Sequence, residues 1–344
     1  MTLLSVQDLH VQYATPHGAL HALRGISFDL SQGESLGFVG ESGCGKTTLA
    51  RAILRLLPPN GSVVQGRVLF RERNVVELPL PELRKLRWRE ISLVTQSAMN
   101  ALDPVVRVGA QIVEAIRAHE PCTRQAAFER AGALFELVGL KPEWLRRYPH
   151  EFSGGMRQRA IIAMALALDP SLIIADEPTT ALDVVMQDQV YEQIERIRRD
   201  RNKALILITH DISLVAENCD RVAVMYAGRI VETAPVRPIL TAPMHPYTIG
   251  LRNAFPDLHG HNRELISIPG APPSLVDLAA GCSFAPRCPF ARERCLNEAP
   301  ALTTVEGARQ VACHFAHESE TFRTLGALEK TWEPDALLRS GEAA

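Results

Sequence analysis

The sequence has no hydrophobic run long enough to cross a membrane. Its longest apolar stretch is Ala160–Leu168, whereas a spanning helix needs roughly 20 apolar residues. We also expect no secretory signal, because no basic region precedes the first apolar residues and both Asp8 and His10 interrupt them. We therefore expect any role at a membrane to depend on partner subunits.

A strong charge of one sign is missing as well. The 344 residues carry 37 Lys and Arg against 39 Asp and Glu, which gives a formal net charge of -2 and no basic footprint for nucleic acid. The sequence shows no internal repeat. Its hydrophobic content of 46% is ample for a buried core, and its length allows more than one domain.

One stretch carries clear chemistry, and it reads Gly40-Glu41-Ser42-Gly43-Cys44-Gly45-Lys46-Thr47-Thr48. It fits the phosphate-binding pattern G-x-x-x-x-G-K-[ST] at every fixed position. An apolar run at 35–39 predicts a strand before it, and residues 48–57 predict a helix after it. The glycines let successive N–H groups point inward as an anion nest, above the positive end of the helix. Lys46 is placed to reach the β- and γ-phosphates, and the Thr47 hydroxyl to bind Mg²⁺.

A second cluster of polar residues follows the apolar run Leu172–Ala175, which predicts a strand. Asp176 and Glu177 leave this strand at its carboxyl end, the edge where parallel α/β sheets bind ligands. One carboxylate can hold Mg²⁺ while its neighbour polarises the attacking water. We assign Asp176 to the metal and Glu177 to the general base.

A third motif lies between these two and reads Phe152-Ser153-Gly154-Gly155-Met156-Arg157-Gln158. With all three motifs in this order, residues 3–235 resemble the ATP-binding subunits of ABC transporters. The resemblance implies that Ser153, Gly154 and Gly155 form the signature that binds the γ-phosphate held by the opposite subunit.

The resemblance also implies roles for single residues. Gln96 matches the glutamine that touches Mg²⁺ and water, His210 matches the switch histidine, and residues 181–183 match the D-loop. Tyr13 stands where the family stacks an aromatic ring on adenine. Residues 147–151 are our candidate for contact with the membrane subunits.

Two features indicate a branch of this family. The signature has Met156 where Gln is usual, as is common in peptide and nickel importers, and the segment Pro243-Met-His245-Pro246-Tyr247-Thr248 resembles an element of peptide-importer ATPases. The expected fold is therefore an α/β P-loop NTPase (RecA-like) core with an antiparallel β subdomain and a helical subdomain at about 97–165. Beyond the nucleotide-binding domain, 3–235, we expect an irregular Cys-rich extension over 236–344, since eleven of the 23 prolines lie between Pro235 and Pro300.

Four of the seven cysteines lie in this extension, namely Cys282, Cys288, Cys295 and Cys313. In a reducing compartment such a group favours a metal over disulfides. The spacing lacks the C-x2-C pairs typical of structural zinc, and it is not that of a ferredoxin. Resemblance to importer ATPases that carry a cluster favours [4Fe–4S]. Zinc, with His314 as a possible ligand, and metal-free packing stay open. The other thiols include Cys44, whose alkylation we expect to inhibit ATP hydrolysis, with ATP protecting.

Together these features predict an ATP-hydrolysing subunit of an ABC importer for peptides or a related solute, with ATP and Mg²⁺ as cofactors. The resemblance implies a second ATPase subunit, more commonly a paralogue, two transmembrane permease subunits and an extracytoplasmic solute-binding protein. It places the chain peripherally on the cytoplasmic face of the membrane. The alternatives are a nickel or oligosaccharide importer, an exporter ATPase, and a soluble ABC ATPase of translation or DNA repair. The exporter is disfavoured by the Cys-rich tail. The soluble ATPase is disfavoured because the chain shows neither a tandem domain nor a long coiled-coil insertion.

Overall fold

The computed structural model describes residues 1–95, 101–179, 184–254, 265–276 and 280–333. The chain forms two compact units, each built from separate stretches of sequence. Unit 1 contains 1–4, 29–35 and 69–208, and unit 2 contains 5–28, 36–68 and 209–344.

Unit 1 contains three parallel strands and most of the long helices. The strands run in the order β8-β7-β6, with Ala204 opposite Leu172 and Leu172 opposite Ile91. Every residue of β7 and β8 is buried, which explains why both read as continuous apolar runs rather than as alternating patterns. The bounds are α2 Leu80–Leu86, β6 Ile91–Val94, α3 Val108–His119, α4 Arg124–Leu137, α5 Gly154–Ala165, β7 Leu172–Asp176, α6 Val184–Asp200 and β8 Ala204–Ile208.

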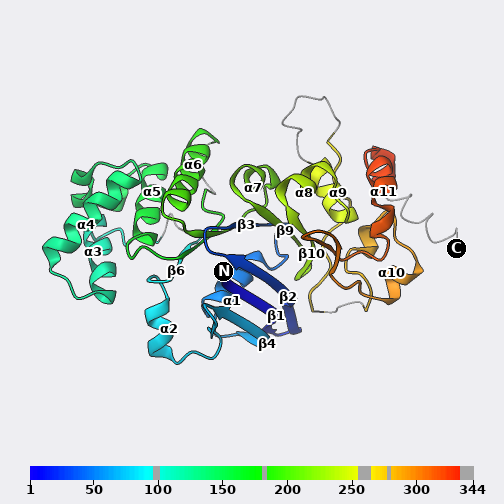
Figure 1. The fold of residues 1–344 in the computed structure, drawn as a ribbon, viewed down its shortest axis with the longest axis horizontal. Coiled ribbons are helices and arrows are strands. Elements are labelled where there is room, and N and C mark those ends of the chain that lie inside the picture. Colours follow the sequence, from blue (N-terminus) through cyan, green and yellow to red (C-terminus); the bar gives the residue numbers. More distant parts are fainter. Residues whose placement is uncertain (96–100, 180–183, 255–264, 277–279, 334–344) are drawn as a thin grey trace. The chain divides into compact units, whose positions relative to one another are not determined.

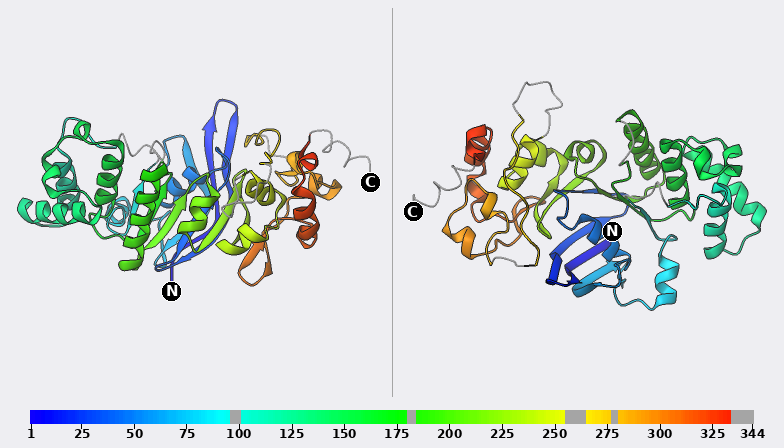
Figure 2. Two further views of the ribbon diagram at one scale, coloured as in Figure 1. Left: turned by 90° about the horizontal axis from the view of Figure 1, so that it is seen from above. Right: turned by 180° about the vertical axis from the view of Figure 1, so that it is seen from behind.

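Helices α3, α4 and α5 pack on one another in unit 1, within the range where the sequence predicts a helical subdomain (Figures 1 and 2). The short 3₁₀ helices Pro142–Arg146 and Pro149–Glu151 connect α4 to α5. Thr123 caps α4 by accepting the N–H of Ala126. Both α3 and α4 lie within the predicted range 97–165.

Unit 2 contains the phosphate loop and a mixed set of strands in the order β11-β12-β10-β9-β3. Strand β3 is parallel to β9, whereas β9, β10, β12 and β11 are antiparallel to one another. Strands β9 and β10 are joined by a turn at Ala227 and Gly228, and both residues have positive φ. The bounds are β3 Ser35–Val39, α1 Lys46–Ile53, α7 Ile212–Asn218, β9 Arg221–Tyr226, β10 Arg229–Pro235, α8 Val236–Thr241, α9 Pro246–Asn253, α10 Glu293–Asn297, β11 Thr303–Glu306, β12 Arg309–Val311 and α11 Ser319–Gly326.

A second sheet has the order β2-β1-β4-β5 and supplies the expected antiparallel β subdomain. Its strands are β1 Thr2–Thr15, β2 Gly18–Ser31, β4 Gly61–Phe70 and β5 Arg73–Asn74. In β2, apolar and polar residues alternate cleanly only from Ile26 to Ser31.

The C-terminal segment has more regular structure than its prolines led us to expect. Its helices are short, but β12 extends the antiparallel strands by pairing with β10, with Val311 opposite Glu232. Additional 3₁₀ helices are Ala285–Arg287, Ala316–Glu318 and Glu329–Trp332. Over the described ranges, no helix is long and apolar enough to span a membrane.

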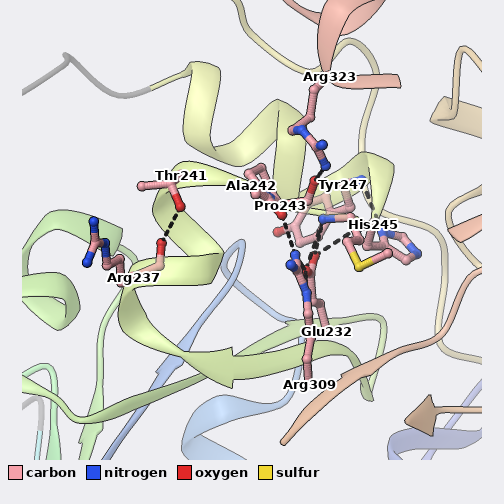
Figure 3. A network of polar contacts seen from close by, with 10 residues as sticks. Glu232, Arg237, Thr241, Ala242, Pro243, His245, Tyr247, Arg309 and Arg323 are labelled. Carbon is pink, nitrogen blue, oxygen red and sulfur yellow. Dashed lines mark hydrogen bonds and ion pairs between the residues drawn. The ribbon is translucent and has the colours of Figure 1, made fainter. Parts of the chain in front are cut away.

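The buried carboxylate of Glu232, a residue of β10, fixes the C-terminal segment to this strand (Figure 3). Glu232 is fully buried and accepts hydrogen bonds from the N–H groups of Met244 and His245, at 3.0 and 2.9 Å. Arg309 of β12 pairs with the same carboxylate and also donates to the carbonyl of Ala242. One side chain therefore joins β10, β12 and the start of α9.

Candidate functional site: a phosphate loop joined to a cysteine-lined pocket

The phosphate loop connects β3 to α1, and three of its glycines adopt positive φ. A side chain at Gly40, with φ of 153°, would place Cβ 2.2 Å from the carbonyl oxygen of Met225. At Gly45, with φ of 106°, it would lie 2.5 Å from the oxygen of Ala22. Only glycine fits these positions, because both the backbone conformation and the space exclude a Cβ atom.

Lys46 is the first residue of α1 and is buried within this loop. Its ammonium donates to the carbonyl oxygens of Gly40 and Glu41, at 2.6 and 3.1 Å. Gly45 caps the helix without a side-chain hydrogen bond, so the first N–H groups of α1 face the loop. A buried cation beside a helix amino terminus is a site that can hold phosphate oxygens. Helix α1 begins two residues before the predicted start and ends four residues before the predicted end.

Cys44 is enclosed by the loop, with only 5% of its surface exposed. Burial raises the pKa of its thiol, although the nearby Lys46 ammonium opposes this. The thiolate is the form that reacts with alkylating reagents. Inhibition by alkylation therefore requires the loop to open.

We expect thiol reagents to modify Cys122 well before Cys44 in the folded protein, because Cys122 is partly exposed and Cys44 is not. Timed treatment with iodoacetamide, followed by mass spectrometry of the peptides, measures both rates. Equal rates would contradict the burial of Cys44, and treatment in urea supplies the reference in which both thiols are accessible.

Tyr13 lies beside the far end of the loop. Its hydroxyl is 3.2 Å from that of Thr48, and its half-buried ring lies against Gly61, where a Cβ would come within 2.6 Å. An aromatic face next to a phosphate loop can stack on a base.

Asp176 and Glu177 lie at the carboxyl end of β7, as the sequence predicts. Asp176 is buried and Glu177 is partly exposed. Glu177 has a φ of 46°, and its N–H donates to the carbonyl oxygen of Ile208 at the end of β8. The backbone is thus turned sharply at this residue, a conformation that is unusual for a residue other than glycine.

The serine of the predicted signature caps a helix. Ser153 is exposed and accepts the N–H of Met156 at the start of α5. Gly155 is buried, and a Cβ there would lie 2.2 Å from the terminal methyl group of Met186. Ser153 and Gly154 therefore present a helix amino terminus at the surface of unit 1.

His210 is exposed and follows β8 by two residues. The N–H of its neighbour Thr209 donates to Phe38 of β3, which places this turn beside the strand that leads into the phosphate loop. Gln96 and residues 181–183, to which the sequence assigned roles, lie outside the described residues.

The four cysteines predicted as one ligand set line a single pocket. Its other walls are mostly apolar, and they include the rings of Phe284, Phe290, Phe315 and Phe322. Backbone hydrogen bonds from residues 284, 290 and 315 reach the thiols of Cys282, Cys288 and Cys313, in each case from two positions further along the chain. Burial raises the pKa of all three thiols, that of Cys313 to about 12. In the described part of the chain, no three His, Cys, Asp or Glu side chains are grouped as a single metal ion requires.

No sequence feature indicates the direct contacts that the structure shows between the phosphate loop and the C-terminal segment. Arg287 makes two hydrogen bonds to the carboxylate of Glu41, at 2.7 and 3.0 Å, and the N–H of Glu41 donates to the hydroxyl of Tyr247 at 2.9 Å. Only the position of Tyr247 in the His-Pro-Tyr element marked it as notable. Nothing distinguished Arg287 from the other arginines.

His245 is buried, and burial lowers its pKa to about 3. Its Nδ1 accepts the N–H of Tyr247, and the ring also hydrogen-bonds the backbone of Ala312. The ring is thus held neutral between α9 and the residue before Cys313.

We expect this neutral histidine to make stability fall in mild acid. The unfolded chain takes up a proton near pH 6.5 while the native ring stays neutral, so the free energy of unfolding falls by about 1.4 kcal/mol per pH unit below 6.5, down to the native pKa near 3. Urea denaturation of wild type and His245→Gln between pH 7.5 and 4.5 measures this contribution as the difference in slope. Identical slopes would show that His245 does not cause the loss.

Comparison with known proteins defines the class of this molecule. The ABC transporter family model matches residues 23–180, and the structure aligns with that of the bacterial ABC transporter cassette MJ0796 with a TM-score of 0.62, 24% identity, and coverage of 68% of this chain and 99% of the cassette. The fold is therefore that of an ABC cassette ATPase.

Further matches give the family. The model of the oligopeptide/dipeptide transporter C-terminal region matches residues 231–295. The chain is 47% identical over 314 residues to the oligopeptide transport ATP-binding protein OppD of Salmonella typhimurium, covering 90% of this chain and 93% of the relative. It is 45% identical to the dipeptide transport ATP-binding protein DppD of Bacillus subtilis, covering 90% and 94%. The chain belongs to this family of oligopeptide and dipeptide ABC transporter ATP-binding proteins, and it is an ATPase coupled to transport.

Proposed function

We propose that this subunit hydrolyses ATP to drive the uptake of oligopeptides or dipeptides. The observation that carries the choice of peptide over nickel or oligosaccharide is the match of residues 231–295 to the peptide-transporter C-terminal region, which contains the buried His245-Pro246-Tyr247 element. The relatives OppD and DppD are named for the transport of oligopeptides and dipeptides.

The proposed domains are a nucleotide-binding domain at 3–235 and a C-terminal extension at 236–344. In the first, residues 40–48 bind the phosphates and Tyr13 stacks on the adenine. Thr47, Gln96 and Asp176 hold Mg²⁺. The buried Lys46 ammonium and the amino terminus of α1 support the loop's part in this assignment.

Hydrolysis is phosphoryl transfer to water, in which positioning and charge stabilisation dominate. Glu177 accepts the proton of the attacking water, Gln96 orients that water, and His210 contacts the γ-phosphate. Ser153, Gly154 and Gly155 bind the ATP held by a second ATPase subunit, so two subunits close head to tail around the nucleotides. The exposure of Ser153 at the start of α5 supports a contact across subunits.

The proposed partners are a paralogous ATPase subunit, two permease subunits and an extracytoplasmic solute-binding protein, with this chain on the cytoplasmic face of the membrane. The test is ATP hydrolysis by the transporter in proteoliposomes. Binding protein loaded with peptide should stimulate the rate, and binding protein with nickel or oligosaccharide should not. Stimulation by nickel alone would assign the other branch.

We further propose that Cys282, Cys288, Cys295 and Cys313 hold a [4Fe–4S] cluster, with zinc as the alternative. The residues fit this group, since four thiols line one apolar pocket and backbone N–H groups reach three of them. In a cluster each cysteine binds a different iron, so the sulfurs need not converge on one ion. When bound, the cluster supplies covalent cross-links between segments, and we assign it a structural role.

Replacing Cys288, which is buried, with Ser should remove most of the bound iron and lower the melting temperature, because one ligand of the cluster is lost. Anaerobic purification followed by an absorption spectrum and by iron, sulfide and zinc analysis provides the measurement. Cys122→Ser, far along the sequence from the pocket, should retain the wild-type metal content. One zinc per wild-type chain, or no metal, would reject the cluster and leave the ATPase assignment intact.

A further inference from the structure

Glu41, which follows the first glycine of the phosphate loop, is bound by two residues of the C-terminal segment. The carboxylate of Glu41 receives both terminal nitrogens of Arg287, and its backbone N–H donates to the Tyr247 hydroxyl. Side chain and peptide are thus fixed independently. Such a double attachment restricts rotation of the Glu41 peptide, which neither contact would do alone.

Arg287 is itself fixed. It is 6% exposed, and its Nε donates to the carbonyl of Pro269 at 2.8 Å. Another of its nitrogens donates to the Tyr226 hydroxyl at 3.2 Å. Because these partners hold the planar guanidinium in place, it can donate two parallel hydrogen bonds to the Glu41 carboxylate. A lysine ammonium cannot reproduce this geometry.

Tyr247 is equally constrained. It is fully buried, and its ring packs against those of Tyr226 and Phe284, with centroids 4.6 and 5.4 Å away. Its N–H is bound by the neutral ring of His245. The hydroxyl therefore stays in one position relative to α9.

Glu41 passes this constraint to Lys46, the lysine of the phosphate loop. The carbonyl of Glu41 accepts from the Lys46 ammonium at 3.1 Å and from the N–H of Cys44 at 3.3 Å. A change in the Glu41 peptide would therefore move both the lysine and the loop backbone that face the phosphates.

We propose that Arg287 and Tyr247 are positioning residues that act through Glu41 to hold the phosphate loop and Lys46 in the geometry that binds MgATP. This rests on the proposed binding of MgATP at the loop. Arg287 directly precedes Cys288, and Phe284 lines the cysteine pocket while packing on Tyr247. The contacts thus connect that pocket to the loop.

The test is the Kd of a fluorescent ATP analogue with Mg²⁺, measured together with the melting temperature without nucleotide. Arg287→Met should weaken binding about 10-fold, the equivalent of one charged hydrogen-bonded pair, and Tyr247→Phe about 3-fold. Arg287→Lys should recover part of the loss. Glu41→Gln combined with Arg287→Met should bind no more weakly than Arg287→Met alone, because both changes break the same contact.

The chain offers a matched control in Arg292, which makes the same two-bond pair with Glu318 at 2.8 and 2.5 Å, also in the C-terminal segment. Arg292→Met should leave the Kd unchanged. Equal weakening by Arg292→Met, or an unchanged Kd in Arg287→Met and Tyr247→Phe, would overturn the positioning role. Wild-type protein that failed to bind the analogue would instead count against the loop assignment itself, and Lys46→Ala provides the non-binding reference.

Discussion

Replacing Glu177 with Gln should reduce ATP turnover by at least about 100-fold while leaving MgATP binding nearly unchanged. A positioned general base contributes about 10²–10⁴-fold to rate, and the amide has the size of the carboxylate but cannot accept the proton. The residue directly follows β7, at the carboxyl end of the strand, and has a φ of 46°. Steady-state phosphate release and nucleotide titration on the same sample separate the two effects.

The closed form should accumulate in this variant, because ATP is bound but not consumed. Gel filtration with ATP should show association of Glu177→Gln with its partner ATPase subunit, and wild type should show it only transiently. Glu217→Gln, an exposed carboxylate on α7, is the control and should retain normal turnover. Turnover near the wild-type rate in Glu177→Gln would remove Glu177 as the base.

Replacing Glu232 with Ala should destabilise unit 2 by about 3–5 kcal/mol, the usual cost of leaving one member of a buried ion pair without its partner. The Arg309 guanidinium, the Met244 N–H and the His245 N–H would all lose their acceptor in a site that is closed to water (Figure 3). Urea denaturation of the purified chain, followed by circular dichroism, measures the change.

An exposed ion pair provides the comparison. Glu298 pairs with Arg294 on the surface of the C-terminal segment, where solvent screens the interaction. Glu298→Ala should therefore leave the denaturation midpoint unchanged. If Glu232→Ala were as stable as Glu298→Ala, β10 would not depend on this carboxylate for its attachment to β12 and α9.

The sequence predicts those parts of the fold in which local pattern and burial coincide. Strands β3, β7 and β8 are buried at every residue, so their apolar runs could be identified directly. The glycine-rich loop could be placed because strand and helix flank it. Strand β11 is exposed along its whole length and has no such pattern, so the β11–β12 hairpin was missed.

The contacts of the phosphate loop show where sequence reasoning ends. Glu41 and Arg287 are separated by 246 positions, and their pairing depends on how α9 and the 3₁₀ helix at Ala285–Arg287 pack. Glu41 stands at a variable position of the loop motif, and no neighbouring residue in the sequence indicates which side chain it will pair with. The same holds for Glu232 and Arg309, which meet only because β12 pairs with β10.

The separation of Glu41 from Arg287 also has a consequence during synthesis. The ribosome makes the phosphate loop first and then adds 246 residues before the arginine that holds it. At about 5–20 residues per second, this interval lasts on the order of ten seconds to one minute. Throughout that time the nascent chain carries the whole phosphate loop without the arginine that positions Glu41. The loop therefore reaches its final geometry only late in translation, after the C-terminal segment has folded against it.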